Sequence, residues 1–217
     1  TAANAAPTCP TISPMNGLDL DEWLRKTWYV TEQQVTGYLH PDSFYCVTAT
    51  YNVTGDARKK KVPFFKGTVI GVHNYDNHNV TNGPATNTDK EIPGGLCARA
   101  ENASLPSKLL VAPCFIPNLL AGNYWVLDVG MDNNGHYTWG IISGGQPTEK
   151  FADGCTTKET GQNGSGLWIF VRDPAAARAD SQEVIAAKKR LHALGFTTSR
   201  LMPIDHKGCE YNGAVFK

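Results

Sequence analysis

Short segments rich in β-branched and aromatic residues recur along the chain, and each lies within a few residues of a Gly, Pro, Asn or Asp. Runs of this composition, bounded by turn-forming residues, are typical of β-strands. The pattern predicts eight strands at close spacing, at residues 28–34, 44–53, 64–72, 96–100, 108–115, 124–129, 137–143 and 167–172. Strands connected by polar turns in this way predict a sandwich or an up-and-down barrel.

One segment departs from the strand pattern. In residues 180–195, apolar side chains recur every three or four positions, which is typical of an amphipathic helix. Asp180 and Glu183 have the spacing of a capping box at its start, and Gly195 supplies a stop. A short entry helix carrying Trp23 is also expected before the first strand. The predicted order is therefore eight strands, one long helix and a short last strand near residues 197–202.

The composition fits a single globular domain over residues 1–217. Within it, residues 1–22 form an N-terminal tail and entry segment, and residues 196–217 form the last strand and the C-terminal tail. Lys+Arg and Asp+Glu number 20 each, and this balance argues against a nucleic-acid surface or a polybasic membrane patch. No apolar run approaches the roughly 20 residues of a membrane-spanning helix, so no transmembrane segment is expected.

Cysteines and sequons predict the compartment. The six cysteines are spread over the chain with no C-x-x-C pair, which favours three structural disulfides over a zinc or redox site, and six cysteines allow 15 pairings. Residues 1–6 resemble the region near a signal-peptide cleavage site, although a trimmed chain reads the same. N-x-[ST] sequons, which are the glycosylation candidates, lie at Asn52, Asn79, Asn102 and Asn163. A secreted glycoprotein is the expectation, with an organelle lumen such as the thylakoid lumen as the alternative.

Two motifs at the strand ends resemble those of the lipocalin family. Lys26-Thr27-Trp28-Tyr29 resembles the family's G-x-W motif with Lys in place of Gly, and residues 167–174 (LWIFVRDP) resemble its motif that ends on an Arg. The resemblance implies an all-β fold, an eight-stranded antiparallel up-and-down barrel with one C-terminal helix packed outside. It also implies a structural role for Trp28 and Arg172, because in the family this Arg lies over this Trp ring and closes one end of the barrel.

The branch most resembled is that of apolipoprotein D and the insect bilin-binding proteins. It is matched by Cys9-Pro10, by Cys46 followed five residues later by Tyr51, by Cys209 and by the YWVLD segment at residues 124–128. The resemblance implies the disulfides Cys9–Cys155 and Cys46–Cys209 and, with them, a third bridge Cys97–Cys114. One departure is that the family's T-D-Y motif falls on Val129-Gly130-Met131.

An eight-stranded barrel can enclose one small ligand. Alternation along the last barrel strand turns Trp168 inward, and the resemblance carries Trp168 and Tyr51 over as cavity walls; the alternative is that both rings pack the core or the helix. A second tier of aromatic candidates for the wall is Phe44, Phe65, Phe115, Tyr124, Trp125 and Trp139. Such a wall suits a flat or elongated apolar molecule, such as a carotenoid, bilin, chlorophyll derivative, sterol or fatty acid, without an obligatory cofactor.

The main hypothesis for function is binding and transport or storage of such a ligand, with no catalytic step. The sequence contains no G-x-S-x-G, H-E-x-x-H or phosphate-binding motif, and a metal site at His73 and His78 is disfavoured against simple solvation. One alternative is an enzyme acting on a xanthophyll or lipid, for which Glu32 and Asp128 are the acidic pair. Another is a scaffold that binds a protein partner through the loops at residues 74–93 and 147–165.

Overall fold

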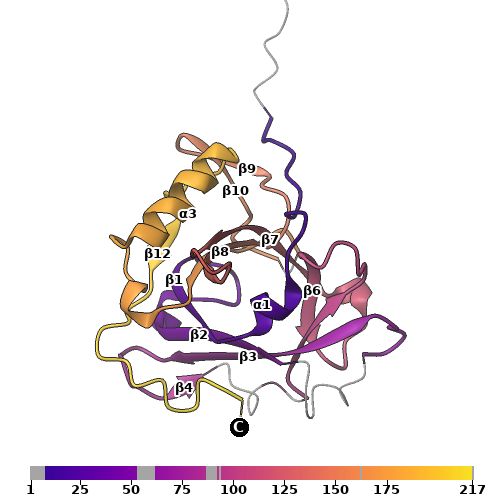
Figure 1. Ribbon diagram of the computed structural model, residues 1–217, viewed down its shortest axis with the longest axis horizontal. Helices are drawn as coiled ribbons and strands as arrows, with labels where there is room; N and C mark the ends of the chain where they lie inside the picture. The colour runs from indigo at the N-terminus through magenta and orange to yellow at the C-terminus, as the bar shows by residue number, and fades with distance from the viewer. Residues whose placement is uncertain (1–7, 53–61, 87–91, 93, 162, 217) are drawn as a thin grey trace, which may run out of the picture.

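The computed structural model describes residues 8–52, 62–86, 92, 94–161 and 163–216. Its main sheet contains the strands β1 (Trp28–Gln34), β2 (Tyr45–Asn52), β3 (Thr68–Asn77), β5 (Leu96–Ala100), β6 (Lys108–Pro113), β7 (Gly122–Met131), β8 (Tyr137–Ser143) and β11 (Leu167–Val171). Each pairs antiparallel with the next in this order, and β11 pairs back with β1, so the sheet closes into a barrel (Figure 1). The predicted eight-stranded antiparallel barrel is confirmed.

Smaller elements surround the barrel. They are α1 (Leu20–Leu24), η1 (Pro41–Ser43), β4 (Ala85–Thr86), η2 (Asn118–Leu120), β9 (Glu149–Phe151), β10 (Gly154–Thr156), η3 (Pro174–Ala176), α3 (Gln182–Ala193) and β12 (Leu201–Pro203). Figure 1 shows α3 along the outside of the barrel, and β12 pairs with the end of β1. None of the helices in the described part of the chain is long and apolar enough to cross a lipid bilayer.

The helix α3 forms as its periodicity predicts. Val184, Ala187 and Leu191 are fully buried and pack against the outer side chains of β8 and β11. The N-cap lies one residue later than predicted: the Ser181 hydroxyl accepts the N–H of Val184 at 3.3 Å, whereas Asp180 lies outside the helix. Gly195 has a φ of +84° just after the helix, which is the left-handed conformation that ends helices.

The strand β3 is displaced from its predicted range. It was expected at residues 64–72 but spans Thr68–Asn77. Phe64 has a φ of +60° and a fully exposed side chain, and the pairing of β3 with β5 begins only at Thr68. The polar residues at the other end, which composition assigned to a loop, pair with β2 at Tyr45↔Asn77 and Thr48↔Tyr75. Backbone pairing therefore overrides the low β-propensity of Asn and Asp at this position.

Three disulfides fix the segments that flank the barrel, and they are the pairs that the resemblance implied. Cys9–Cys155 ties the N-terminal segment to β10, Cys46–Cys209 ties the C-terminal segment to β2, and Cys97–Cys114 joins β5 to the residue after β6. Their Cα–Cα distances are 5.7, 5.6 and 4.9 Å, within the usual range. The bridges fit an extracellular protein.

Candidate functional site

Side-chain alternation along β11 divides the barrel into an inner and an outer face. Trp168 and Phe170 belong to the interior cluster, whereas Ile169 and Val171 pack outward in the cluster under α3. The register carries this division to β1, where Val30 lies opposite Phe170 and Gln33 lies opposite Trp168. Paired residues share a face of the sheet, so Val30 and Gln33 point into the barrel.

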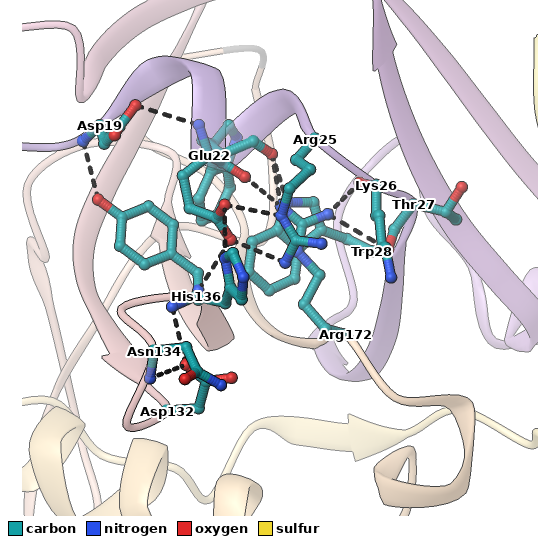
Figure 2. Close-up of polar contacts among 12 residues, drawn as sticks. Asp19, Glu22, Arg25, Lys26, Thr27, Trp28, Asp132, Asn134, His136 and Arg172 are labelled. Atoms are coloured by element: carbon teal, nitrogen blue, oxygen red, sulfur yellow. Dashed lines mark hydrogen bonds and ion pairs between the residues drawn. The ribbon is translucent and has the colours of Figure 1, made fainter.

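One end of the barrel is closed by an aromatic plug. Trp23 from α1 and Trp28 from β1 are fully buried, and their ring centroids lie 4.5 Å apart. The guanidinium of Arg172 lies 3.6 Å from the centroid of Trp28, the contact that the resemblance implied. Arg172 also donates to the carbonyls of Glu22 and Trp23 at 2.8 Å each and to that of Lys26 (Figure 2). Burial lowers the pKa of Arg172 to about 9, which leaves it charged at neutral pH.

The carboxylate of Glu22 fastens α1 over this plug. It accepts Arg25 Nε at 2.7 Å and the N–H of Tyr137 at 2.9 Å, and His136 Nδ1 lies 3.3 Å from it (Figure 2). Desolvation raises the pKa of Glu22, but the hydrogen bonds from these three groups outweigh it and hold the pKa at about 2. The Tyr137 hydroxyl in turn accepts the N–H of Asp19 at 2.8 Å. The entry helix is thus attached to the β7–β8 turn.

Above the plug the barrel contains a cavity of about 570 Å³. Most side chains of its wall are apolar, and they come from every strand of the barrel except β8. Among the residues that line the cavity are Val30, Gln33, Val47, Tyr51, Val72, Leu96, Val111, Tyr124, Trp168 and Phe170. A volume in this range is typical of small-molecule sites. The arrangement can bury an apolar molecule.

A hydrogen-bonded pair of tyrosines spans the barrel interior. The hydroxyls of Tyr51 and Tyr124 lie 2.6 Å apart, and these residues come from β2 and β7, which are on opposite sides of the closed strand order. The Tyr51 ring lies 6.4 Å from the ring of Trp23 in the plug. Burial raises the pKa of both phenols above the usual range, so both stay neutral. The pair forms a polar but uncharged floor of the cavity.

The mouth is the opposite end, where the connections between strands meet. The residues of the wall here are Tyr38, Leu39, Ile92, Ile116, Leu120 and Gly161. Sequence reasoning missed the residue that fixes the β6–β7 connection, the fully buried Arg99. Its guanidinium donates to the carbonyls of Cys97, Ala112, Pro113 and Ile116 at 2.8–3.3 Å. The only signal in the sequence was a cation alternating with alanines inside a predicted strand.

The structure brings three of the eight predicted wall residues to the cavity, namely Tyr51, Tyr124 and Trp168. Phe44 is buried in the same interior cluster but does not border the cavity.

The other four predicted wall residues lie elsewhere. Trp125 and Trp139 pack on the outer face near α3; adjacent strand residues such as Tyr124 and Trp125 alternate, so both could not point inward. Phe65 packs against the Cys97–Cys114 bridge, and Phe115 is exposed in the β6–β7 connection. The prediction that these four side chains line the cavity is therefore corrected: none of them borders it.

The acidic pair required by the enzyme alternative also lies outside the cavity. Glu32 is buried against α3, with Lys188 Nζ at 2.6 Å, and Asp128 forms an ion pair with Arg190 of the same helix. These ion pairs attach α3 to the barrel, so that version of the enzyme hypothesis is not supported.

The remaining candidates are the two histidines that were considered for a metal site and the two loops that were considered for a protein partner. Their described residues lie among contacts within the protein. His73 is buried on β3, where its Nε2 lies 2.8 Å from the carbonyl of Gly213, and His78 lies beside Asp42 at 3.8 Å. Within the described ranges no group of three or more His, Cys, Asp or Glu side chains could hold a metal ion. The loops predicted to bind a partner are partly ordered elements, since residues 74–77 belong to β3 and residues 149–156 form the β9–β10 hairpin; residues 87–91 and 93 lie outside the described residues.

The four sequons differ in accessibility. Asn79, Asn102 and Asn163 are exposed, whereas Asn52 is half-buried at the end of β2. The side-chain oxygen of Asn163 accepts the N–H of Asn123 at 3.1 Å, close to the cavity mouth. Glycosylation at these positions stays a prediction.

Neither a scan against protein-family models nor a search of curated protein sequences gives a match. Solved structures do resemble this one at low identity. The major allergen Per a 4 from cockroaches aligns at 13% identity with a TM-score of 0.52, over 95% of this chain and 98% of the allergen. Insecticyanin from the tobacco hornworm Manduca sexta aligns at 14% identity with a TM-score of 0.53, over 98% of this chain and 94% of its own.

Apocrustacyanin C2 gives similar values, 13% identity and a TM-score of 0.53 over 95% of this chain and 97% of its own. These proteins are lipocalins, and the chain has the lipocalin fold.

Proposed function

We propose that this protein binds a small hydrophobic molecule inside its barrel and transports or stores it. The observation that carries the proposal is the cavity of about 570 Å³, whose wall is mainly apolar and which lies between a sealed plug and a mouth. Removing apolar surface from water contributes about 25 cal/mol per Å², so burial of about 300 Å² of ligand supplies roughly 7 kcal/mol before ordering costs. The lipocalin fold supports the same function, since lipocalins bind small hydrophobic ligands.

The aromatic side chains of the cavity wall favour a ligand that is flat or elongated. The Trp168 ring borders the wall near the mouth, and the Tyr51 and Tyr124 rings border the floor, so a ligand between them contacts aromatic faces along its length. A carotenoid, bilin, chlorophyll derivative, sterol or fatty acid is therefore the class of cargo that we propose. We further propose a secreted protein, for which the three disulfides and the exposed sequons are the support.

The test begins with protein purified from its natural source. An absorption spectrum, together with mass spectrometry of an organic-solvent extract, is expected to reveal one apolar compound at close to one molecule per chain. Ligand-free protein is then titrated with a neutral fluorescent apolar probe, N-phenyl-1-naphthylamine. Micromolar binding that the extracted compound displaces supports the proposal. A lipid-free natural protein whose ligand-free form also fails to bind the probe overturns it.

A further inference from the structure

The amide of Gln33 in the cavity wall is open to the cavity. The Gln33 side chain is 2% exposed and borders the cavity, and the described residues offer it no hydrogen bond. The next residue shows how this chain treats a buried glutamine elsewhere: Gln34, on the other face of β1, donates to the carbonyl of Thr157 at 2.8 Å and accepts the Thr156 hydroxyl at 2.7 Å. The amide atoms of Gln33 are not among the buried polar atoms that lack a partner, so they are open to the cavity and can pair with a molecule that enters it.

The position of Gln33 places this amide far from the plug. It lies opposite Trp168 on β11, whose ring also borders the cavity. It follows Trp28, at the closed end, by five positions, and at about 3.3 Å per residue this is about 16 Å along the strand. The amide therefore lies in the mouth half of the cavity, whereas the hydroxyl pair of Tyr51 and Tyr124 forms the floor.

Both polar points offer neutral hydrogen-bonding groups. A glutamine amide has two N–H donors and one acceptor oxygen, and a pair of hydroxyls that share one hydrogen bond retains one further O–H donor. The rest of the wall is mainly apolar, with Val30, Val47 and Phe170 among its side chains. Other polar side chains that border the cavity include those of Thr48, Asn74, Asp76 and Asn123. The polar groups of this wall form hydrogen bonds with a ligand only if the ligand carries a polar atom at the matching position.

We infer that the cargo is a neutral, elongated apolar molecule with a hydroxyl or carbonyl oxygen that hydrogen-bonds to the Gln33 amide beside Trp168. The inference rests on the proposed function, because it names the ligand class for the same cavity. A plain hydrocarbon leaves the amide unpaired. A carboxylate would lose its hydration shell against a neutral amide and an apolar wall, which disfavours it.

The experiment measures competition against N-phenyl-1-naphthylamine by dodecane, dodecanol and dodecanoate, with the full chain and its disulfides intact. Wild-type protein is expected to bind dodecanol about tenfold more tightly than dodecane, since one net hydrogen bond is worth about that ratio, and more tightly than dodecanoate. In the variants Gln33→Leu and Gln33→Met, the preference for dodecanol is expected to fall to about onefold while dodecane affinity is kept. Retained dodecane binding also shows that each variant folds.

A matched control makes the same substitution outside the cavity. Gln182 is an exposed residue at the start of α3, so Gln182→Leu is expected to keep the tenfold preference. If wild-type protein binds all three compounds equally, or if the Gln33 variants keep the preference, the inference is overturned although the cavity still binds apolar molecules. If neither the probe nor any of the three compounds binds, the proposed function is overturned together with it.

Discussion

Glu22 holds the entry helix through hydrogen bonds that its ionised carboxylate accepts. Desolvation alone raises its pKa, but the Arg25, Tyr137 and His136 donors bring it from 4.5 to about 2 in the folded protein. A folded-state pKa below the unfolded one gives stability that is fully present above pH 4.5 and is lost as the pH falls toward 2. Because Arg25 and His136 are partly exposed, we expect a loss of about 1 to 2 kcal/mol across this window.

Urea unfolding of wild-type protein and of E22Q at a series of pH values tests this prediction. E22Q is expected to be less stable at pH 7 and to show a smaller loss between pH 4.5 and pH 2. Glu210, an exposed carboxylate near the C-terminus, supplies the control variant E210Q, which should follow the wild-type curve. Parallel curves for E22Q and wild type would contradict the assignment.

Arg172 combines charge, planar shape and several donors at one position, and lysine cannot replace all three. Its guanidinium stacks 3.6 Å from the Trp28 centroid and donates to backbone carbonyls of α1 and the segment that follows it. We expect Arg172→Lys to lower the free energy of unfolding by about 2 to 3 kcal/mol, because carbonyls and the ring face lose their partner. Thermal unfolding checks the stability, and probe affinity measured well below the new midpoint should change little, since the plug lies below the cavity floor.

At the scale of elements, the β6–β7 connection depends on Arg99. Four carbonyls accept from its guanidinium, and two of them, those of Pro113 and Ile116, lie at or just after the end of β6. We expect Arg99→Met to loosen this connection selectively, because buried carbonyls are left unpaired. Hydrogen exchange of residues 114–121 should then accelerate more than that of β8, which is far from Arg99 in the strand order. Uniform acceleration over the whole barrel would instead indicate general destabilisation.

Strand composition and helical periodicity were sufficient to predict the barrel elements, but two local features escaped them. β3 could not be bounded, because its last residues are Asn and Asp, which pair with β2 only once the barrel closes. On β11, which is regular, alternation along the sequence shows which side chains face inward and which face outward. Register shifts on β1 between Val30 and Glu32, and on β7 between Val126 and Asp128, invert this alternation of side chains. This explains why alternation gives the inward direction that Trp168 has in the structure, and why Gln33, beyond a bulge, was overlooked.

At the scale of the whole molecule, the cavity forms only when the sheet closes into a barrel, and nearly every strand contributes residues to its wall. No single segment of sequence therefore reveals it. The predictions of wall residues rested on alternation and the lipocalin resemblance for Trp168, on the resemblance for Tyr51, and on aromatic character alone for Tyr124. Tyr51 and Tyr124 illustrate the limit, because their 2.6 Å contact joins residues 73 positions apart. The contact between Trp28 and Arg172 was easier to predict, because Trp28 lies at the start of β1 and Arg172 directly follows β11, and both strand ends can be located from the sequence.

The disulfides should stabilise the molecule unequally. Cys9–Cys155 and Cys46–Cys209 span 146 and 163 residues, whereas Cys97–Cys114 spans 17. In the chain-entropy description, a bridge that closes a longer loop restricts the unfolded chain more, which gives about 5 kcal/mol for either long bridge and about 3 kcal/mol for the short one. We expect paired Cys→Ala variants, measured by urea unfolding without reductant, to lose about 2 kcal/mol more when a long bridge is removed. Equal losses for all three would show that local packing, as around the buried Cys97, outweighs loop entropy.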